Sequence, residues 1–123
     1  MEDVKQTAVA TEEKKTNVTE SDTDGLNYTH VFKNPFEFEG KTYDKFTFNF
    51  EGLLGSDMIA VENEMAAVGE YVLSPEISTS FLSKMAARAA GVVSDLIEHL
   101  PIRDFGKIKN KSRDFLVTTG LTD

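Results

Sequence analysis

Few residues of this chain have the types and spacing that catalysis requires. The 123-residue sequence contains two histidines and no cysteine. His30 falls in an expected strand, and His99 lies at the end of an expected helix, where a positive charge would suit the negative helix terminus. The lack of Cys excludes disulfides, thiolate nucleophiles and Cys-based metal sites. We therefore expect structural roles for both histidines.

The other groups that could take part in acid–base or nucleophilic chemistry are also poorly arranged. Glu62 and Glu64 are two positions apart, so they do not share a helix face and make a poor acid–base pair. Ser78, Ser80 and Ser83 have no histidine near them in the sequence. The HExxH and EF-hand patterns are absent from the sequence. The sequence predicts a protein that is not an enzyme, with no catalytic residues, metal site or cofactor.

Apolar side chains at helical spacing are better suited to binding than to chemistry. One stripe of an expected helix consists of Met58, Val61, Met65, Val68 and Val72. Such a stripe is either core or, because thioethers adapt to varied partners, a soft binding surface. A second candidate surface is the run of small residues in the following helix, which includes Ala86, Ala89 and Ala90. Their lack of bulk would let another element approach closely.

The formal charge of −8 is unevenly distributed along the chain. An acidic chain is a poor nucleic-acid binder, because phosphate binding depends on Lys and Arg. Only the segment 101–123 carries more bases than acids, five against three. Most of these bases are closely spaced: Lys107, Lys109, Lys111 and Arg113. We interpret them as the solvated face of a helix, with RNA or DNA contact as the alternative.

The first part of the chain divides into a polar arm and an aromatic hairpin. Residues 1–27 have few apolar side chains, and we expect a disordered acidic arm because too little surface could be buried to offset the entropy of ordering it. Residues 28–50 contain six of the nine Phe, which alternate along two strands joined by a turn at Gly40. Tyr43 is out of phase with the second strand, which predicts a bulge or twist near Asp44.

Three helices are expected after the hairpin. The first begins at about residue 56 or 57, with Ser56 or Asp57 as its N-cap, and reaches residue 72. The second and longest covers 78–99, and the third covers 104–118. Pro101 ends the second helix, and Gly120 stops the third.

These elements predict an α+β fold, in which an N-terminal β-hairpin packs on a small bundle of about three helices. Residues 28–120 would form a single domain behind the arm. The polar side of the central helix is marked by Lys84, Arg88, Asp95 and Glu98. The sequence shows no apolar run long enough to span a bilayer and no signal-peptide pattern, so we expect a soluble protein of the cytosol without membrane contact.

Four short segments carry a family resemblance through their order and spacing. They are Phe36-Glu37-Phe38-Glu39-Gly40-Lys41-Thr42-Tyr43, the apolar strand 46–50, Leu100-Pro101-Ile102-Arg103-Asp104-Phe105 and the ending Asp114-Phe115-Leu116. In this arrangement the chain resembles the Mu-like family of phage tail assembly chaperones. The resemblance covers residues 31–117. The arm 1–27 departs from it, because family members usually start close to the hairpin.

The resemblance implies a non-enzymatic protein that binds the tape measure protein, keeps this long helical chain soluble and helps tail tube subunits assemble around it. Such a protein would act in the host bacterial cytoplasm and be absent from the mature virion. The tail tube protein is a second candidate partner, and self-association through a homo-oligomer is a third. We expect the client helix to be captured between the Met58–Val72 stripe and the Ala-rich face of the long helix, at Ala86, Ala89 and Ala90.

Two other classes of protein remain as alternatives. One is a structural head–tail or tail adaptor that is retained in the virion, and it would be found in purified particles. The other is a small nucleic-acid-binding regulator acting through residues 107–113, and it would be retained on DNA or RNA at moderate salt.

Overall fold

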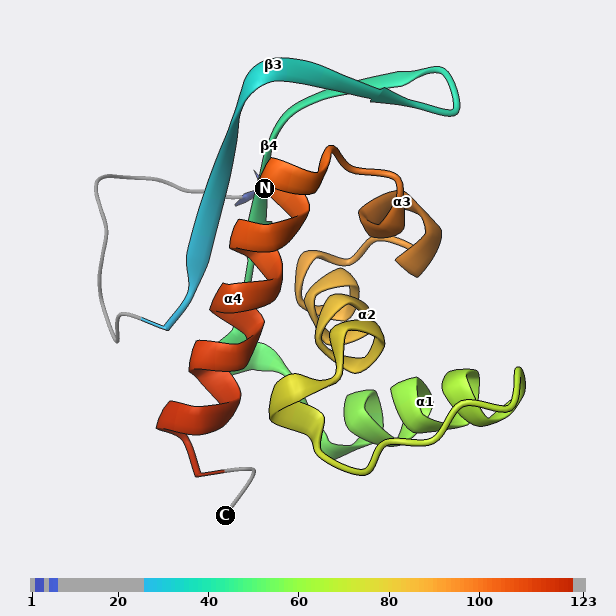
Figure 1. Cartoon of the computed structure of the whole chain (residues 1–123). Coiled ribbons are helices and arrows are strands. Elements are labelled where there is room, and N and C mark those ends of the chain that lie inside the picture. Colours follow the sequence, from blue (N-terminus) through green and yellow to red (C-terminus); the bar gives the residue numbers. More distant parts are fainter. Residues whose placement is uncertain (1, 4, 7–25, 121–123) are drawn as a thin grey trace.

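The computed structural model describes residues 2–3, 5–6 and 26–120. In this part of the chain a β-hairpin packs against four α-helices (Figure 1), which confirms the predicted α+β fold. The elements in chain order are β1 (Glu2–Asp3), β2 (Lys5–Gln6), β3 (Tyr28–Phe38), β4 (Lys41–Phe48), the 3-10 turn η1 (Phe50–Gly52), α1 (Gly55–Ala66), the 3-10 turn η2 (Pro75–Ile77), α2 (Thr79–Ala90), α3 (Ser94–Glu98) and α4 (Ile102–Thr118).

The short strands β1 and β2 pair only with each other, and β3 and β4 form the hairpin. The disorder predicted for residues 1–27 falls mostly outside the described residues. Two residues at the end of that segment are described and are attached to the domain. Leu26 packs against the core, and the side-chain oxygen of Asn27 accepts a hydrogen bond of 3.0 Å from the backbone N–H of Glu51.

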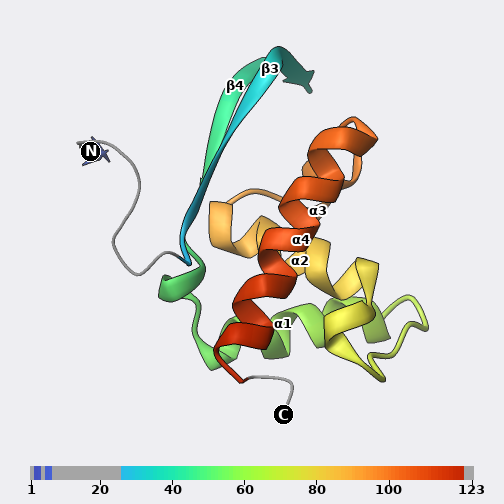
Figure 2. The same cartoon turned by 60° about the vertical axis from the view of Figure 1, so that its left-hand side comes forward.

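The hairpin is bent by a change of register between its two halves. Val31 lies opposite Lys45, whereas Phe36 lies opposite Tyr43, so β3 advances five residues while β4 advances two. The irregularity therefore sits across from Asp44, where a bulge or twist was predicted, although the extra residues belong to β3. Figures 1 and 2 show the resulting bend and the outer half of the hairpin extending beyond the helices.

The inner face of the hairpin supplies much of the core. Alternate side chains of the two strands and the turn after them are buried: His30, Phe32, Phe46, Phe48 and Phe50. The Phe50 ring stacks on that of Phe115 in α4, with 5.6 Å between centroids. Burying one such side chain contributes about 1.5–3 kcal/mol. The predicted inward alternation of the aromatic residues is confirmed.

Helix α1 is shorter than the spacing of apolar residues predicts. Gly69 adopts a φ of 82°, and the N–H of Glu70 donates to the carbonyl of Met65 over 2.9 Å. This is a Schellman motif, which satisfies the last carbonyls of a helix and turns the chain away from its axis. Val68 and Val72 therefore lie beyond α1, and the prediction that the first helix reaches residue 72 is wrong.

The expected long helix over 78–99 is interrupted in the same way. Gly91 adopts a φ of 72°, and the N–H of Val92 donates to the carbonyl of Ala87 over 3.0 Å. The chain then leaves the helical direction through Val93, whose backbone is extended, before α3 begins. The prediction of one continuous helix is wrong because Gly91 is a helix stop and not an interior residue.

Helix α2 is the central helix of the domain, and it contacts α1, α3, α4 and β4. Its small residues allow an unusually close approach, as expected from the sequence. The backbone N–H of Asn49, just after β4, donates directly to the carbonyl of Ala89 over 3.0 Å. Among the described helices, none combines the length and apolarity needed to cross a membrane.

Candidate interaction surface

The residues predicted to bind a partner are divided between the core and the surface. Val61, Met65, Ala86 and Ala89 are buried, Met58, Val72 and Ala90 are half-buried, and Val68 is exposed. Met65 is only 2% exposed, and Val61 is fully covered. These two side chains belong to the same buried cluster as Ala86 and Ala89.

The groove expected between the apolar stripe and the Ala-rich face is therefore closed. Helices α1 and α2 pack directly against each other and fill that space with their own side chains. A client helix could reach Val61 or Met65 only if the two helices separated. The stripe chiefly forms core at this position, which is the first of the two interpretations that its spacing allowed.

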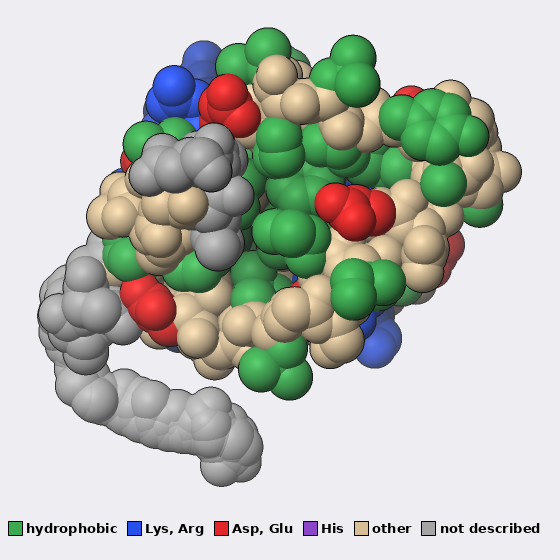
Figure 3. All heavy atoms as spheres, turned by 90° about the horizontal axis from the view of Figure 1, so that it is seen from below, with side chains coloured by type: hydrophobic (Ala, Val, Ile, Leu, Met, Phe, Trp, Pro, Cys, Tyr) green, Lys and Arg blue, Asp and Glu red, His purple; other side chains and the backbone are tan. Residues whose placement is uncertain are grey.

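A different apolar surface lies on α1 and on the segments that precede and follow it. Six of the ten large hydrophobic residues that are exposed in the described chain come from α1 and the segment around residues 53–77: Leu54, Ile59, Val68, Tyr71, Leu73 and Ile77. We call these six residues the apolar face. Figure 3 looks onto this end and shows apolar side chains gathered in and around a hollow. Exposed apolar side chains that gather at one end of a protein in this way typically mark an interaction site.

The apolar face is carried largely by a long connection. After the Schellman turn at Gly69, the chain has no regular structure until η2, and it turns back from the end of α1 toward α2 (Figure 1). The connection is tied at its far end, where the Ser78 hydroxyl accepts from the N–H of Phe81 and caps α2. Ser80 also donates to the carboxylate of Glu70 over 3.2 Å. These polar contacts and the half-buried side chain of Val72 attach the connection to the domain.

Polar contacts also fix α1 on α2. The Arg88 guanidinium donates to Asp57 over 2.7 Å, and Lys84 contacts Glu64 at 3.1 Å and Glu98 at 2.9 Å. Lys84 thus joins three helices and is only 8% exposed, although the sequence places it on the polar side of its helix. Its aliphatic stem lies between the helices while its ammonium group reaches the two carboxylates.

The protonation of these groups follows from their partners. Burial by itself would lower the pKa of Lys84, but the hydrogen bonds to Glu98 and Glu64 outweigh burial and raise that pKa above its ordinary value. The pKa of Asp57 is lowered, first by the hydrogen bond of 2.7 Å from the backbone N–H of Leu54 and then by the bond from Arg88. Asp57 therefore caps α1 from its first turn. The N-cap of α1 is Leu54, so the prediction of Ser56 or Asp57 as the N-cap is wrong.

The buried histidine links the hairpin to α4. His30 is hydrogen-bonded to the Tyr28 hydroxyl through Nδ1 at 2.8 Å and to the Asp104 carboxylate through Nε2 at 2.7 Å. Burial raises the pKa of Tyr28, and the nearby negative charge of Asp104 raises it further. His99 lies elsewhere, with its ring 5.5 Å from that of Phe38. Within the described residues no group of three His, Asp or Glu side chains could hold a metal ion.

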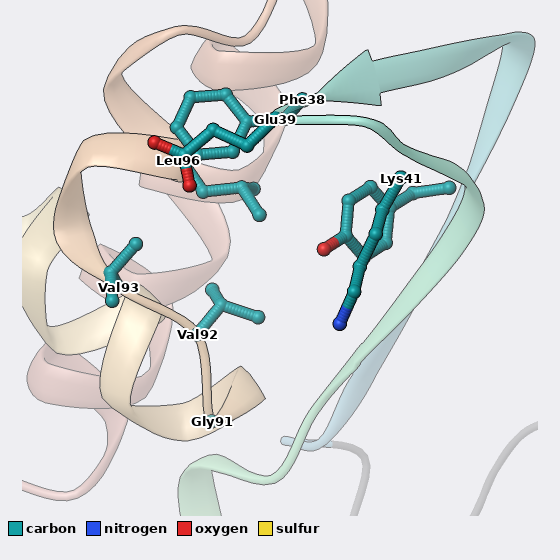
Figure 4. A pocket seen from close by; sticks show the side chains of 8 residues that line it. Phe38, Glu39, Lys41, Gly91, Val92, Val93 and Leu96 are labelled. Atoms are coloured by element: carbon teal, nitrogen blue, oxygen red, sulfur yellow. The ribbon is translucent and has the colours of Figure 1, made fainter.

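A second opening lies between the tip of the hairpin and the connection from α2 to α3 (Figure 4). Its volume is about 280 Å³. The lining residues are Phe38, Glu39, Lys41 and Tyr43 from the hairpin, and Gly91, Val92, Val93 and Leu96 from the helices. This volume lies at the lower end of the range for small-molecule pockets, which begins at about 300 Å³, so the opening would admit only a small ligand. The apolar face exposes six large apolar side chains and is the stronger candidate for binding a protein partner.

Sequence reasoning missed the apolar face and the bridging role of Lys84. The signal for the first was available in Gly69, because a glycine stop would have assigned the apolar residues after it to a surface connection. The spacing of Lys84 and Arg88 placed them correctly on one helix face but did not reveal that acidic residues of α1 and α3 cover it. Comparison with models of protein families, with curated proteins and with solved structures finds no match for this chain.

Proposed function

We propose that the protein is a phage tail assembly chaperone that binds the tape measure protein through the apolar face. It would keep this client soluble in the host cytoplasm while tail tube subunits assemble, and leave before the virion is complete. The observation that carries the proposal is the concentration of exposed apolar side chains at one end of a domain whose core is otherwise well covered.

The physical properties of the apolar face suit a transient client. Leu73 is 93% exposed. Covering it and its neighbours with apolar client surface would stabilise the complex by about 25 cal/mol for each Å² of apolar surface removed from water. The face is partly built from an irregular connection, which can adjust to several helices more easily than a rigid groove can. Binding that is apolar and adaptable favours moderate affinity, as a chaperone that must release its client requires.

The family resemblance supports the proposal through the scaffold. Its hairpin segment, residues 36–43, forms the tip of β3 and β4, and its Leu100–Phe105 segment opens α4. The proposed client site is the apolar face, which lies at the end of the domain opposite the hairpin tip.

Co-expression with a phage tape measure protein tests the proposal. The unchanged protein should keep the client in the soluble fraction, and Leu73→Asp should lose this ability while remaining folded, because Leu73 makes no buried contact. The matched control is Ile102→Asp, which changes another strongly exposed residue (82%) in the first turn of α4, where an acid is tolerated. It should behave like the unchanged protein.

Two results would contradict the proposal. A client that stays insoluble in the presence of the unchanged protein would remove the chaperone role. Stoichiometric recovery of the protein in purified particles would instead indicate an adaptor that is retained in the virion.

A further inference from the structure

The apolar face lies in a stretch of chain without any positive charge. Between Lys45 and Lys84 the sequence has no Lys or Arg, although it contains six acids: Glu51, Asp57, Glu62, Glu64, Glu70 and Glu76. Two of these acids, Asp57 and Glu64, are paired with Arg88 and Lys84 of α2. The remaining four form no salt bridge with a described residue, so they leave the surroundings of the apolar face negatively charged.

The space-filling view agrees with this charge distribution. Figure 3 shows acidic side chains directly beside the apolar hollow, whereas Lys and Arg lie at the margin of the view. Glu62 and Glu70 are exposed, and each is close in sequence to a residue of the apolar face, Ile59 and Tyr71 respectively. A partner that covers the apolar side chains must therefore place its own flanking groups near carboxylates.

The negative charge near the apolar face argues against two binding partners that the protein itself could supply, its own N-terminal segment and a second copy. Residues 1–25 carry seven acids and three bases, so this segment would be repelled by the same carboxylates. A second copy that presents its own apolar face would bring like charges together. A second copy that presents α4 would offer Lys107, Lys111 and Arg113 but few apolar side chains, and the apolar face would stay uncovered.

We propose that the apolar face binds an amphipathic helix whose apolar stripe is flanked by Lys and Arg. This inference rests on the proposed function and specifies the class of client segment that the chaperone selects. The apolar stripe would cover residues such as Leu73 and Ile77, while the flanking cations would approach Glu62 and Glu70. Apolar burial supplies the affinity, and complementary charge supplies the rate of encounter and the choice among apolar helices.

The test uses two designed peptides and the full chain. Each peptide has about 18 residues with leucines on one helical face, and the flanking positions are Lys in one peptide and Glu in the other. Fluorescence anisotropy should show binding of the Lys peptide that is about tenfold tighter at about 50 mM salt. The preference should shrink at about 500 mM salt, because screening weakens the exposed charges but not the apolar contact.

A pair of variants locates the effect. Glu62→Gln combined with Glu70→Gln should reduce the preference for the Lys peptide to about threefold. The matched control combines Glu37→Gln with Asp44→Asn, which removes the same net charge from exposed positions on the hairpin. It should leave the preference unchanged. Equal loss in both variants would show that only the net charge matters and would overturn the inference.

Further results would overturn the inference or separate it from the proposed function. Equal affinity for the two peptides, or no binding of either, would overturn the inference. Sedimentation that reveals a dimer abolished by Leu73→Asp would assign the apolar face to a second copy and overturn it as well. If the Lys peptide is preferred but the tape measure protein is not kept soluble, the inference stands and the proposed function fails. If the client is kept soluble without any charge preference, only the inference fails.

Discussion

Two regions of the domain treat large apolar side chains in opposite ways. In β4 and η1, Phe48 and Phe50 are fully covered by helices and by neighbouring rings. At the α1 end, Leu73 and Tyr71 are 93% and 74% exposed. Both groups come from segments rich in apolar residues, so composition does not explain the difference.

The difference lies in what the backbone does next to each group. β4 and the turn after it meet α2 and α4, so their aromatic face is covered by elements of the same domain. The chain after Gly69 leaves α1 through a Schellman turn, and no helix or strand among the described residues is folded over its outer side. An apolar segment therefore becomes core or interaction surface according to where the helices stop.

The largest effect on stability should come from the covered aromatic residues of β4 and η1. We expect Phe48→Ala to lower the free energy of unfolding by about 3–5 kcal/mol, because it leaves a cavity in the aromatic core. Urea unfolding would measure the change. Thr47→Ala, at the neighbouring exposed position, should cost little. Similar losses for the two variants would mean that the strand does not present Phe48 to the core.

An intermediate effect should follow from the helix stop between α2 and α3. Gly91→Ala places a side chain at a φ of 72° with no neighbouring atom to clash, so the cost is conformational, about 1–2 kcal/mol. Gly106→Ala is the matched control, since it lies inside α4 with open space around it and should stabilise by about 0.5–1 kcal/mol. Thermal unfolding should therefore shift in opposite directions for the two variants.

A smaller effect should come from the contact that holds α1. Asp57→Ala removes the carboxylate that accepts from the N–H of Leu54 and should lower stability by about 1 kcal/mol at neutral pH. Because folding lowers the pKa of Asp57, its stabilising contribution is present above the ordinary value of 3.8 and is lost as the pH falls below it. Unfolding curves should thus differ at neutral pH and converge in acid. A difference that persists in strong acid would contradict this assignment.

The smallest effect on stability should come from the apolar face itself. Leu73→Ser should change the free energy of unfolding by less than about 0.5 kcal/mol, because the side chain is already in water. It should nevertheless reduce binding of a hydrophobic dye such as ANS. A large loss of stability would show that Leu73 is covered in solution. The contrast between the buried aromatic residues of β4 and η1 and the apolar face would then disappear.

The sequence predicted the hairpin well, because side chains in a strand alternate between two faces with a period of two residues. The alternation of aromatic residues placed Phe46, Phe48 and Phe50 inward, and the phase of Tyr43 located the irregularity opposite Asp44. Such local patterns are fixed by strand geometry. The same reasoning failed at Gly69 and Gly91, because apolar residues continued at helical spacing after each glycine and hid the stop.

The candidate surface was less predictable than the fold. The apolar stripe was found, but its spacing could not show which members α2 would cover, because that depends on tertiary packing. Val61 and Met65 are buried, and Val68 is exposed by a turn of the backbone. Lys84 shows the same limitation for a polar residue, since its partners Glu64 and Glu98 come from separate helices.

The contact between the hairpin and α4 has a consequence for synthesis of the protein. His30 bonds to Asp104, 74 residues later, and Phe50 stacks on Phe115. The aromatic face emerges from the ribosome early, but α4, one of the two helices that cover it, is translated last among the described elements. Until then the nascent chain carries a partly uncovered row of phenylalanines beside exposed strand edges, a combination that favours aggregation. Slow elongation over residues 50–102 would lengthen this exposure, and chaperones that bind the nascent chain would matter most in that interval.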